Sequence, residues 1–463
     1  MIDRGARRPP LASWLLVMTA LFVLSLPAVT ARIYASDEVQ FFSWLRSWAF
    51  DRDVDFQNEY QYFYESSQAG TPLFHETFLE GTNEAGRRIN FAPIGCALLW
   101  APFYAAGHVA AVATGAPANG LSQPYITAVA YGSACYGFLA VLLSAAIARA
   151  VTGRGLAAAM AVALGTPLVF YVYVAPIFAH ASSAFAVALF LWTWLRVRER
   201  WSLTGVVALG LVGGLVAMIR EQDLLIVAGP ALDFLRWAVR SRRLVPRRSA
   251  IALAAAGAGT FVLAYLPQLV AYQALNGHPG PTTLVTRKMT WTAPHALEVL
   301  FSPEHGLFAW TPLAILALAG LALLAADRRR DTDARWIGAL ALLMVCLQIY
   351  VTGAVESWTV AGSFGQRRFI GLTPLLVLGL ATLIAIVRDR SRIERVALGA
   401  TIVLGIWWNV GLMAQFGLHT MDRQRLTLRE NARATFLELP VEGPRLVWRY
   451  LTDRASFYGL PRR

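Results

Sequence analysis

The sequence predicts an all-α polytopic membrane protein, built as a bundle of about 11–12 transmembrane helices with a large first external loop. Only 15% of the 463 residues are charged and 57% are hydrophobic, whereas a typical soluble domain is about 25% charged. Apolar runs of about 17 to 25 residues recur along almost the whole chain, and each is long enough to cross about 30 Å of hydrocarbon. These features exclude a soluble globular protein.

The first apolar run follows a short basic segment and predicts an uncleaved first transmembrane helix. Residues 1–31 then comprise the cytoplasmic N-terminus and this helix, because the many later spans would anchor the chain in any case. The later runs form a multi-helix bundle over residues 91–416, at about 91–113, 123–148, 155–174, 181–195, 204–219, 224–235, 250–273, 306–325, 337–353, 368–387 and 397–416.

The basic residues predict the orientation of the bundle. The formal net charge is +13, and Lys288 is the one lysine in the chain. Most arginines stand in short segments between apolar runs, where they are typical of cytoplasmic loops rather than of a nucleic-acid site. We therefore expect no nucleic-acid partner. The clusters are Arg149/Arg154, Arg196/Arg198/Arg200, Arg236 to Arg248, Arg328/Arg329/Arg330/Arg335 and Arg388 to Arg395.

The segment 91–113 conflicts with this orientation. A full crossing there would place Arg149 and Arg154 outside, so we expect the segment to dip into the membrane without crossing it. Pro93 and Pro102 favour an irregular helix of this kind. Eleven segments then cross and the short tail 417–463 is external. The alternative, that the two arginines break the orientation rule, stays open at this stage.

The long polar segment 32–90 is the predicted catalytic loop. It carries ten of the 28 acidic residues. Asp37 and Glu38 lie close to the first helix, where partial desolvation raises a carboxyl pKa toward the working range of a general base. Aromatic residues that follow at near-helical spacing predict an amphipathic helix on the membrane surface. An ordinary solvated pair is the alternative.

Three further carboxylates in this loop form a candidate metal site. Asp51, Asp53 and Asp55 stand at alternate positions, and carboxylate oxygens are the ligands that hard divalent cations such as Mg²⁺, Mn²⁺ or Ca²⁺ prefer. The calcium-loop pattern is not met, because the turn glycine is missing. A solvated turn is the alternative, so no cofactor is assigned with certainty.

Polar groups at the external ends of predicted spans are the candidate substrate-binding residues. Arg220 and Gln222 interrupt an apolar stretch, which is unfavourable unless they face a cavity or pair with each other. Glu356, Arg367 and Arg368 surround a glycine-rich segment before a span, and arginine forks suit phosphate oxygens. Internal ion pairing and headgroup anchoring are the alternatives.

Isolated titratable residues on the external side complete the candidates. His180 and His305 are expected to contact substrate, although single histidines at helix ends are more often structural. Lys288 is added for its uniqueness. The sequence contains no HExxH motif, phosphate-binding glycine loop or serine-histidine-aspartate order, which argues against a membrane protease or a nucleotide-driven pump.

This constellation resembles the GT-C superfamily of membrane glycosyltransferases, which includes protein O-mannosyltransferases and the lipid A aminoarabinose transferase. The resemblance covers roughly residues 11–420. It depends on the acidic pair after the first helix, on the external arginines, and on three short strings: residues 90–95 with 99–103, residues 218–222 and residues 362–368. It implies a polyprenyl-phosphate-linked sugar as donor and an acidic residue of the first loop, here Asp37, at the catalytic centre.

The expected activity is therefore that of a hexosyl or pentosyl transferase in the bacterial cytoplasmic membrane. A sugar would move from the lipid phosphate to a hydroxyl of a glycan, lipid or protein on the periplasmic or extracellular face, with inversion and with Asp37 as general base. The alternative is a transporter or flippase of a lipid-linked sugar. A transporter should carry ionisable residues near mid-span, whereas here they gather on one side.

Overall fold

The structure is a computed structural model that describes residues 11–66, 70–243, 246–360 and 362–453. Within these residues the chain is helical, and β structure is limited to two isolated bridges, Thr82 with Arg88 and Met289 with Val355. Residues 1–10 and 454–463 at the two ends, which carry parts of the predicted cytoplasmic segment and external tail, lie outside the described residues. The chain is an all-α polytopic membrane protein, as predicted.

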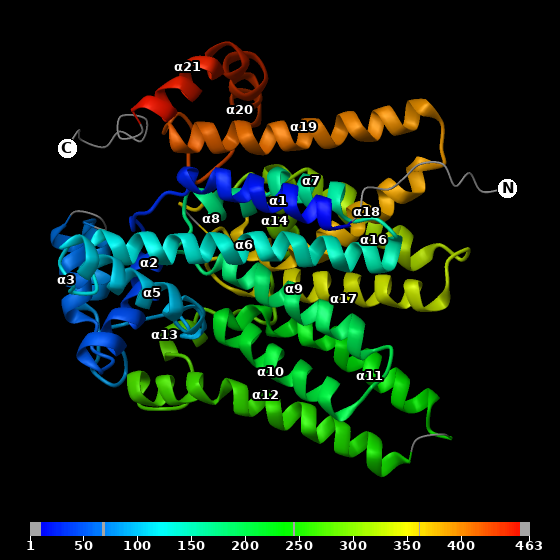
Figure 1. The fold of residues 1–463 in the computed structure, drawn as a ribbon, viewed down its shortest axis with the longest axis horizontal. Helices are drawn as coiled ribbons and strands as arrows, with labels where there is room; N and C mark the ends of the chain where they lie inside the picture. The colour runs from blue at the N-terminus through cyan, green and yellow to red at the C-terminus, as the bar shows by residue number, and fades with distance from the viewer. Residues whose placement is uncertain (1–10, 67–69, 244–245, 361, 454–463) are drawn as a thin grey trace.

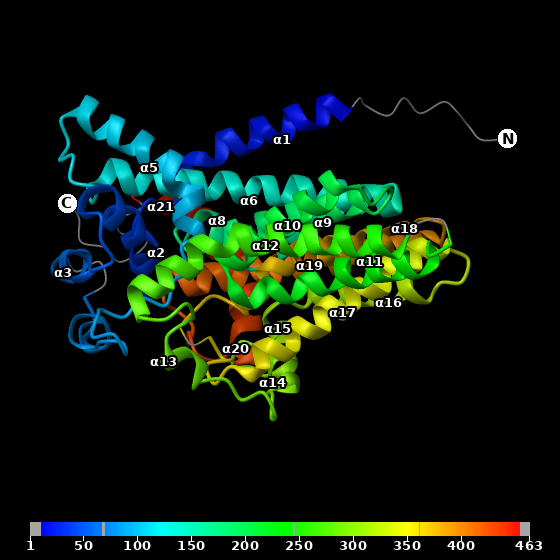
Figure 2. The same cartoon turned by 90° about the horizontal axis from the view of Figure 1, so that it is seen from below.

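Most helices run side by side along the long axis of the molecule (Figures 1 and 2). They are α1 (Leu11–Ser25), α6 (Gln123–Thr152), α7 (Leu156–Gly165), α8 (Leu168–Tyr173), α9 (His180–Val197), α10 (Leu203–Ile219), α11 (Ala228–Arg240), α12 (Arg247–Asn276), α16 (Leu313–Ala326), α17 (Thr332–Ala354), α18 (Thr373–Arg388) and α19 (Arg392–Gly417). In the described part of the chain these helices make eleven passes, because α7 and α8 follow each other in the same direction.

Length and composition identify six of the described helices as long and apolar enough to cross a membrane. These are α5 (Gly95–Thr114), α6, α12, α17, the continuous segment Arg367–Arg388 that contains α18, and α19. The shorter apolar helices include α7, α10 and α16. The bundle therefore combines long spans with shorter passes whose ends are completed by loops and by 3-10 turns.

The two ends of the bundle differ in composition. The predicted arginine clusters all fall in turns or adjoining helix ends at one end of the bundle, which we call the arginine end, where α6, α9, α11, α16 and α18 finish. The opposite end, which we call the loop end, carries the first loop and the connection after α12 (Figure 2). This segregation is the one that the orientation rule requires of a multi-pass membrane protein.

Helix α5 stays at the loop end. Figures 1 and 2 show it beside α2 (Ser36–Arg46) and the start of α6, without reaching the arginine end. Pro102 lies inside this helix, and Gly115 ends it with a φ of 71°. A segment that begins and finishes on one side leaves Arg149 and Arg154 at the arginine end, which resolves the conflict noted in the sequence.

The first loop is a small helical layer. It contains α2, η2 (Ser47–Asp51), α3 (Gln57–Glu65), α4 (Pro72–Phe74) and η3 (His75–Glu80). Phe42, Trp44, Phe56, Tyr60 and Phe63 are fully buried in it. The prediction that the aromatic face of α2 rests on the membrane is therefore wrong: this face packs inside the protein, because neighbouring helices of the same loop offer enough apolar surface to cover it.

The segments after α12 and α19 also lie at the loop end. The first contains α13 (Thr283–Thr286), α14 (Ala296–Phe301) and α15 (Leu307–Trp310). The second contains α20 (Leu428–Arg433), η6 (Ala434–Glu438) and α21 (Leu439–Thr452). The indole of Trp407 in α19 donates a 3.0 Å hydrogen bond to the carbonyl of Thr435, which holds η6 against the bundle.

Helices α16 and α18 come into close backbone contact at two glycines, Gly320 and Gly379. A methyl group at Gly320 would overlap the carbonyl oxygen of Gly379, and one at Gly379 would overlap the carbonyl oxygen of Ala317. Small residues at such crossings let two membrane helices approach to backbone contact. The contact fixes α18, whose N-terminal turn η5 (Arg367–Leu372) carries two of the predicted arginines.

This contact gives a test of the packing. Gly379→Ala should destabilise the protein by about 1–3 kcal/mol, because the added methyl group overpacks the crossing. Gly399→Ala is the matched control: Gly399 is also inside a helix, and a Cβ there meets nothing within 4 Å. Thermal unfolding in detergent should show a lower midpoint for the first variant and an unchanged or higher midpoint for the second. Equal midpoints for the two variants would contradict the crossing.

Candidate active site

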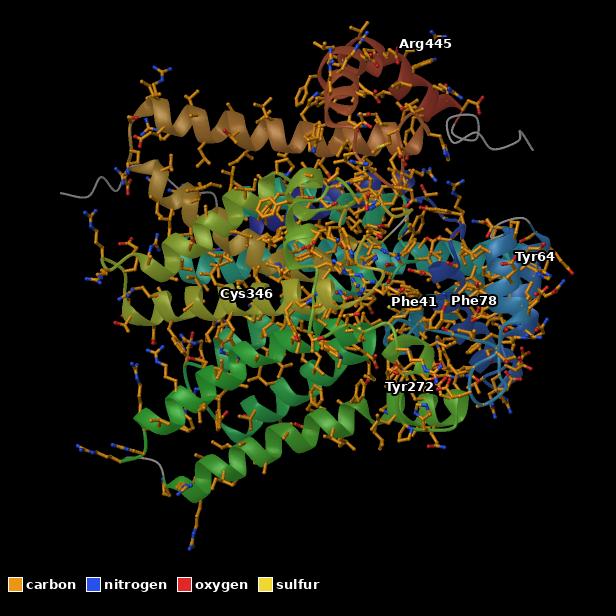
Figure 3. The ribbon with its side chains drawn as sticks, turned by 180° about the vertical axis from the view of Figure 1, so that it is seen from behind. Phe41, Tyr64, Phe78, Tyr272, Cys346 and Arg445 are labelled. Carbon is orange, nitrogen blue, oxygen red and sulfur yellow. The ribbon has the colours of Figure 1, made fainter. Side chains whose placement is uncertain are left out.

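A cavity of about 560 Å³ opens at the loop end. Its walls come from segments far apart in the sequence. On one part of the wall these are the start of α2, the extended residues before α5 and the connection after α12. The others are the start of α9, the end of α10, the end of α17 and the turn before α18. Figure 3 labels Phe41 and Tyr272 on this side of the molecule. The predicted residues that line the cavity are Asp37, His180, Arg220, Gln222, Lys288, Arg367 and Arg368.

Asp37 is held by an ion pair across the cavity wall. Its Oδ2 accepts a 2.6 Å hydrogen bond from Nη1 of Arg367, which lies 330 positions later in the chain. Asp37 stands in the first turn of α2, where the helix dipole favours an anion. The side chain of Asp37 remains 39% exposed and that of Arg367 20% exposed. The pair therefore faces the cavity and can contact a ligand.

The turn that precedes Arg367 is held in place by two glycines and by hydrogen bonds to buried side chains. Gly362 and Gly365 adopt φ values of 73° and 62°, which side chains larger than hydrogen rarely allow. Phe364 between them is buried, and its N–H donates to the hydroxyl of Tyr171 at 3.2 Å. The carbonyl of Ser363 accepts a 2.9 Å hydrogen bond from Nε2 of His305. This turn is thus ordered by packing and by neutral hydrogen bonds, independently of any ligand.

His305 therefore binds the protein backbone rather than the cavity. The predicted substrate contact of His305 is not supported, because its ring is buried and stacks on Trp310 with centroids 4.7 Å apart. Burial lowers the pKa of His305 to about 4, so the ring is neutral near pH 7 and its Nε2–H is free to donate to Ser363. Sequence position alone could not reveal which way this ring points.

Arg220 enters the cavity where α10 ends. Its backbone is extended, with φ −152° and ψ 111°, so the chain leaves the helix at this residue. Nη1 of Arg220 donates to Nδ1 of His180 at 2.8 Å and approaches the carbonyl oxygen of Arg367 at 3.5 Å. Because Nδ1 accepts this bond, His180 is neutral. The buried histidine thus orients one guanidinium beside the other.

Arg368 and Gln222 form the next part of the wall. Nε2 of Gln222 donates to the carbonyl oxygen of Arg368 at 3.1 Å, and Nη1 of Arg368 donates back to Oε1 of Gln222 at 3.5 Å. Nη2 of Arg368 also reaches the hydroxyl of Ser357 at 3.1 Å. Lys288 closes the opposite side, with Nζ 5.9 Å from the ring centroid of Phe91.

The cavity is electropositive. Four cationic side chains line it, Arg220, Lys288, Arg367 and Arg368, against the two carboxylates of Asp37 and Glu221. Guanidinium groups stay charged and offer several donors in a plane, which matches the oxygens of a phosphate. Apolar and aromatic residues such as Phe41, Phe91 and Phe178 share the walls. The arrangement suits an amphiphilic ligand with an anionic group.

Glu38 and Glu356 are further predicted residues that lie outside this cavity. Glu38 is buried in α2, where its Oε2 accepts hydrogen bonds from the N–H groups of Tyr34 and Ala35 at 3.0 and 3.2 Å. It therefore caps its own helix and does not line the cavity beside Asp37. Glu356 is exposed and does not line the cavity. Successive residues of a helix or turn point in different directions, which explains both errors.

The three aspartates proposed as metal ligands each serve the local backbone or a neighbouring side chain. Asp51 pairs with Arg46, Asp53 accepts from the hydroxyl of Ser47 at 2.8 Å, and Asp55 accepts from the N–H of Gln57 at 3.2 Å. Across the part of the chain that the structure describes, no group of three or more His, Cys, Asp or Glu side chains could hold a metal ion. The predicted metal site is therefore not formed by these residues.

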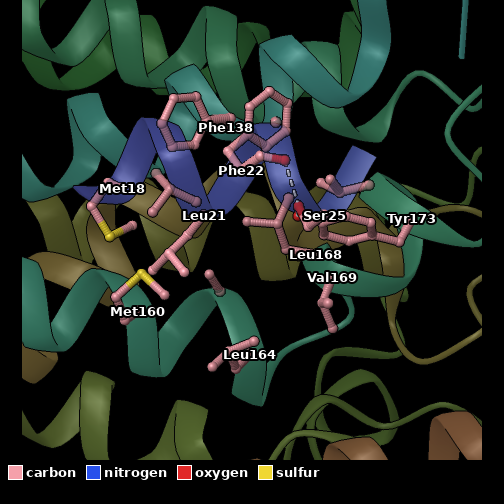
Figure 4. Close-up of a pocket in the computed structure, with 14 residues that line it drawn as sticks. Met18, Leu21, Phe22, Ser25, Phe138, Met160, Leu164, Leu168, Val169 and Tyr173 are labelled. Atoms are coloured by element: carbon pink, nitrogen blue, oxygen red, sulfur yellow. Dashed lines mark hydrogen bonds between the residues drawn. The ribbon is translucent and has the colours of Figure 1, made fainter. Parts of the chain in front are cut away.

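A second cavity, of about 230 Å³, lies between α1, α6, α7 and α8 (Figure 4). Its lining is almost entirely apolar, and the hydroxyls of Ser25 and Tyr173 bond to each other at 2.7 Å. None of its lining residues carries a charge. It therefore offers no acid, base or cation for chemistry.

Comparison with known proteins supports the same fold. No protein-family model and no curated protein matches the sequence. Among solved structures, ArnT from Cupriavidus metallidurans bound to undecaprenyl phosphate is 13% identical, with a TM-score of 0.50 over 97% of this chain and 73% of that chain. This chain shares the fold of that ArnT structure. The resemblance that the short strings indicated is thus confirmed at the level of fold.

Two further structures are similar. The apo form of the same ArnT is 14% identical, with a TM-score of 0.49 over 96% of this chain and 72% of that chain. The apo oligosaccharyltransferase from Archaeoglobus fulgidus is 14% identical, with a TM-score of 0.43 over 97% of this chain and 60% of that chain. At such identity the likeness describes the fold, and the chemistry must be argued from the cavity itself.

The capping role of Glu38 predicts a pH effect on stability. Burial raises its pKa from 4.5 to about 8, so this carboxyl contributes stability at low pH that is lost as the pH rises through 8. Glu38→Gln keeps an acceptor for the two N–H groups without ionising. Thermal unfolding at pH 5, 7 and 9 should show a larger fall in midpoint for the wild type than for Glu38→Gln. Glu38→Ala should unfold at lower temperature throughout. Identical pH profiles for wild type and Glu38→Gln would contradict the assignment.

Proposed function

We propose that this protein is a membrane glycosyltransferase that moves a sugar from a polyprenyl phosphate to an acceptor hydroxyl. The observation that carries the proposal is the Asp37–Arg367 ion pair in the wall of a large electropositive cavity at the loop end of a GT-C fold. A carboxylate that faces a cluster of cations provides a base beside an anion site, and the transfer requires both.

The donor is chosen from the chemistry of the walls. Arg220, Arg367 and Arg368 all line the cavity, and Nη1 of Arg220 approaches the carbonyl oxygen of Arg367 at 3.5 Å. The oxygens of a phosphodiester match the geometry of such forks. The similar ArnT structure was solved with undecaprenyl phosphate, a lipid of this class. A polyprenyl phosphate also explains why the anion site is built into a membrane bundle.

The proposed reaction is a single displacement. The acceptor oxygen attacks the anomeric carbon, its proton passes to Asp37, and the bond between the anomeric carbon and the phosphate oxygen breaks, which releases the polyprenyl phosphate. Attack from the side opposite to the leaving group inverts the anomeric configuration. The arginines stabilise the charge that grows on the departing phosphate.

Arg367 has two roles in this scheme. It pairs with Asp37, and its remaining donors reach the phosphate of a bound donor. Competition by phosphate for the guanidinium loosens its hold on Asp37, which frees that carboxylate to accept the proton of the acceptor hydroxyl. Donor binding and activation of the base are thereby coupled.

The acceptor enters from the loop end. Pro281, Val285, Thr286, Met289 and Trp291 of the connection after α12 line the cavity opposite the first loop. We propose that this connection selects the acceptor, which is a glycan, a lipid or a protein. Since the arginine end is cytoplasmic by the orientation rule, the cavity opens to the periplasmic or extracellular face of a bacterial cytoplasmic membrane.

The test is transfer of labelled sugar by purified protein from a panel of synthetic polyprenyl-phosphate hexose and pentose donors, with and without a chelator. Asp37→Asn should lower kcat by about 100-fold or more and leave donor binding within a few-fold, because it removes the base and keeps the fold. Asp389→Asn, an exposed aspartate at the arginine end, is the matched control and should retain full activity.

Two outcomes would contradict the proposal. Full turnover by Asp37→Asn would remove this residue from the catalytic centre. Donor binding without turnover by the wild type, with acceptors of all three classes present, would favour a transporter or flippase of the lipid-linked sugar. Loss of activity in chelator would require a metal site that the described residues do not form by themselves.

A further inference from the structure

Glu221 is a second carboxylate of the cavity that the proposed displacement does not use. It follows Arg220 at the end of α10 and begins η4 (Glu221–Val227). It lines the same cavity as Asp37. A carboxylate at this depth of a membrane protein is unfavourable unless it is hydrogen-bonded, so its partners indicate what it does.

Two tyrosines of α12 bond to the same oxygen of Glu221. The hydroxyls of Tyr265 and Tyr272 donate to Oε1 at 2.7 and 2.6 Å. Seven residues are close to two helical turns, so both side chains project from one face of α12. Pro267 lies between them and interrupts the helix hydrogen bonds. The two tyrosine hydroxyls together fix the position of Oε1 of Glu221.

The outer part of α12 is itself anchored to the first loop and to the segment between that loop and α5. Oε1 of Gln268 accepts the N–H of Ile94 at 2.9 Å, and Nδ2 of Asn83 donates to the carbonyl oxygen of Leu275 at 2.8 Å. Gln268 and Leu275 are fully buried. Tyr272 lies between these two contacts, so the position of Glu221 is tied to the loop that carries Asp37.

The second oxygen of Glu221 is free to accept. A carboxylate offers about four lone-pair positions, and the two tyrosines occupy Oε1. No described residue donates to Oε2. Like charge keeps the donor phosphate away from Glu221 and near the cavity's cations. The sugar ring of a bound donor carries neutral or cationic substituents. We therefore expect the ring, rather than the phosphate, to contact Oε2.

We propose that Glu221 is a sugar-recognition residue, which accepts a hydrogen bond from one ring substituent of the transferred sugar, a hydroxyl or an ammonium group. The inference rests on the proposed function and names the residue that selects the sugar. Tyr265 and Tyr272 act as positioning residues, because they hold the carboxylate and do not reach the substrate themselves.

The test combines a change in the protein, at Glu221, with a change in the substrate, and measures whether the two effects on kcat/KM are independent. A parent polyprenyl-phosphate donor that the wild type uses is compared with analogues that each lack one ring hydroxyl, or carry an amine there. In the wild type, one deoxy analogue should lose about 10- to 100-fold in kcat/KM, the effect of deleting a hydrogen bond to a charged group. In Glu221→Ala that penalty should fall to within about twofold, while penalties at other positions persist.

Further variants separate recognition from folding. Tyr265→Phe combined with Tyr272→Phe should reduce the same penalty without abolishing turnover, and it carries the test if Glu221→Ala does not fold. Glu298→Gln, an exposed acid on α14, is the matched control and should keep the wild-type pattern. The amine analogue decides between the two substituents: a gain in kcat/KM indicates an ammonium group, and a loss a hydroxyl.

Two failures remain distinguishable. If the wild type transfers no sugar from any parent donor, the proposed function is wrong. If the wild type transfers sugar and every deoxy penalty is the same in Glu221→Ala, Glu221 does not recognise the sugar and the inference is overturned, while the glycosyltransferase proposal stands.

Discussion

The ion pair between Asp37 and Arg367 is the contact on which the arrangement of the cavity depends. It joins the first helix of the external loop to the turn before α18, and within the residues that the structure describes no other ion pair links these two parts. Charge-assisted hydrogen bonds of this kind gain strength where water is partly excluded. The pair also places the proposed base, Asp37, next to Arg367, the cation that would bind a phosphate. One contact therefore serves both the structure and the chemistry.

Neutral groups supply the rigidity that the charges need. His305, Tyr171 and Phe364 fix the turn under Arg367, and His180 orients Arg220. The glycine contact between α16 and α18 holds the helix that follows this turn against its neighbour. Because these groups are uncharged or buried, they hold the cations in place without neutralising them, and the cavity keeps its positive potential for a ligand.

The sequence predicted the features that composition and charge decide. Long apolar runs predicted the passes, and the arginine turns predicted the orientation and the unusual path of α5, because the bilayer imposes both rules on any chain. Asp37, Arg220 and Arg367 were found because a charge at the end of a span needs a reason to be there. Glu38, Glu356 and His305 were misplaced, since their roles depend on side-chain direction and on distant backbone partners. The seven-residue spacing of the two tyrosines on α12 is visible in the sequence and places both on one helix face. Their shared partner, Glu221, becomes evident only in the structure, where α10 and α12 lie side by side.

The central claim is that the cavity beside Asp37 receives a lipid phosphate. An experimental structure of the protein in lipid nanodiscs with added polyprenyl phosphate tests it most directly. The account predicts phosphate density within hydrogen-bond distance of Arg367 and of Arg220 or Arg368, with Asp37 facing it and the prenyl chain leaving toward the bilayer. Phosphate density bound elsewhere, with the Asp37–Arg367 pair intact and the cavity empty, would contradict the account.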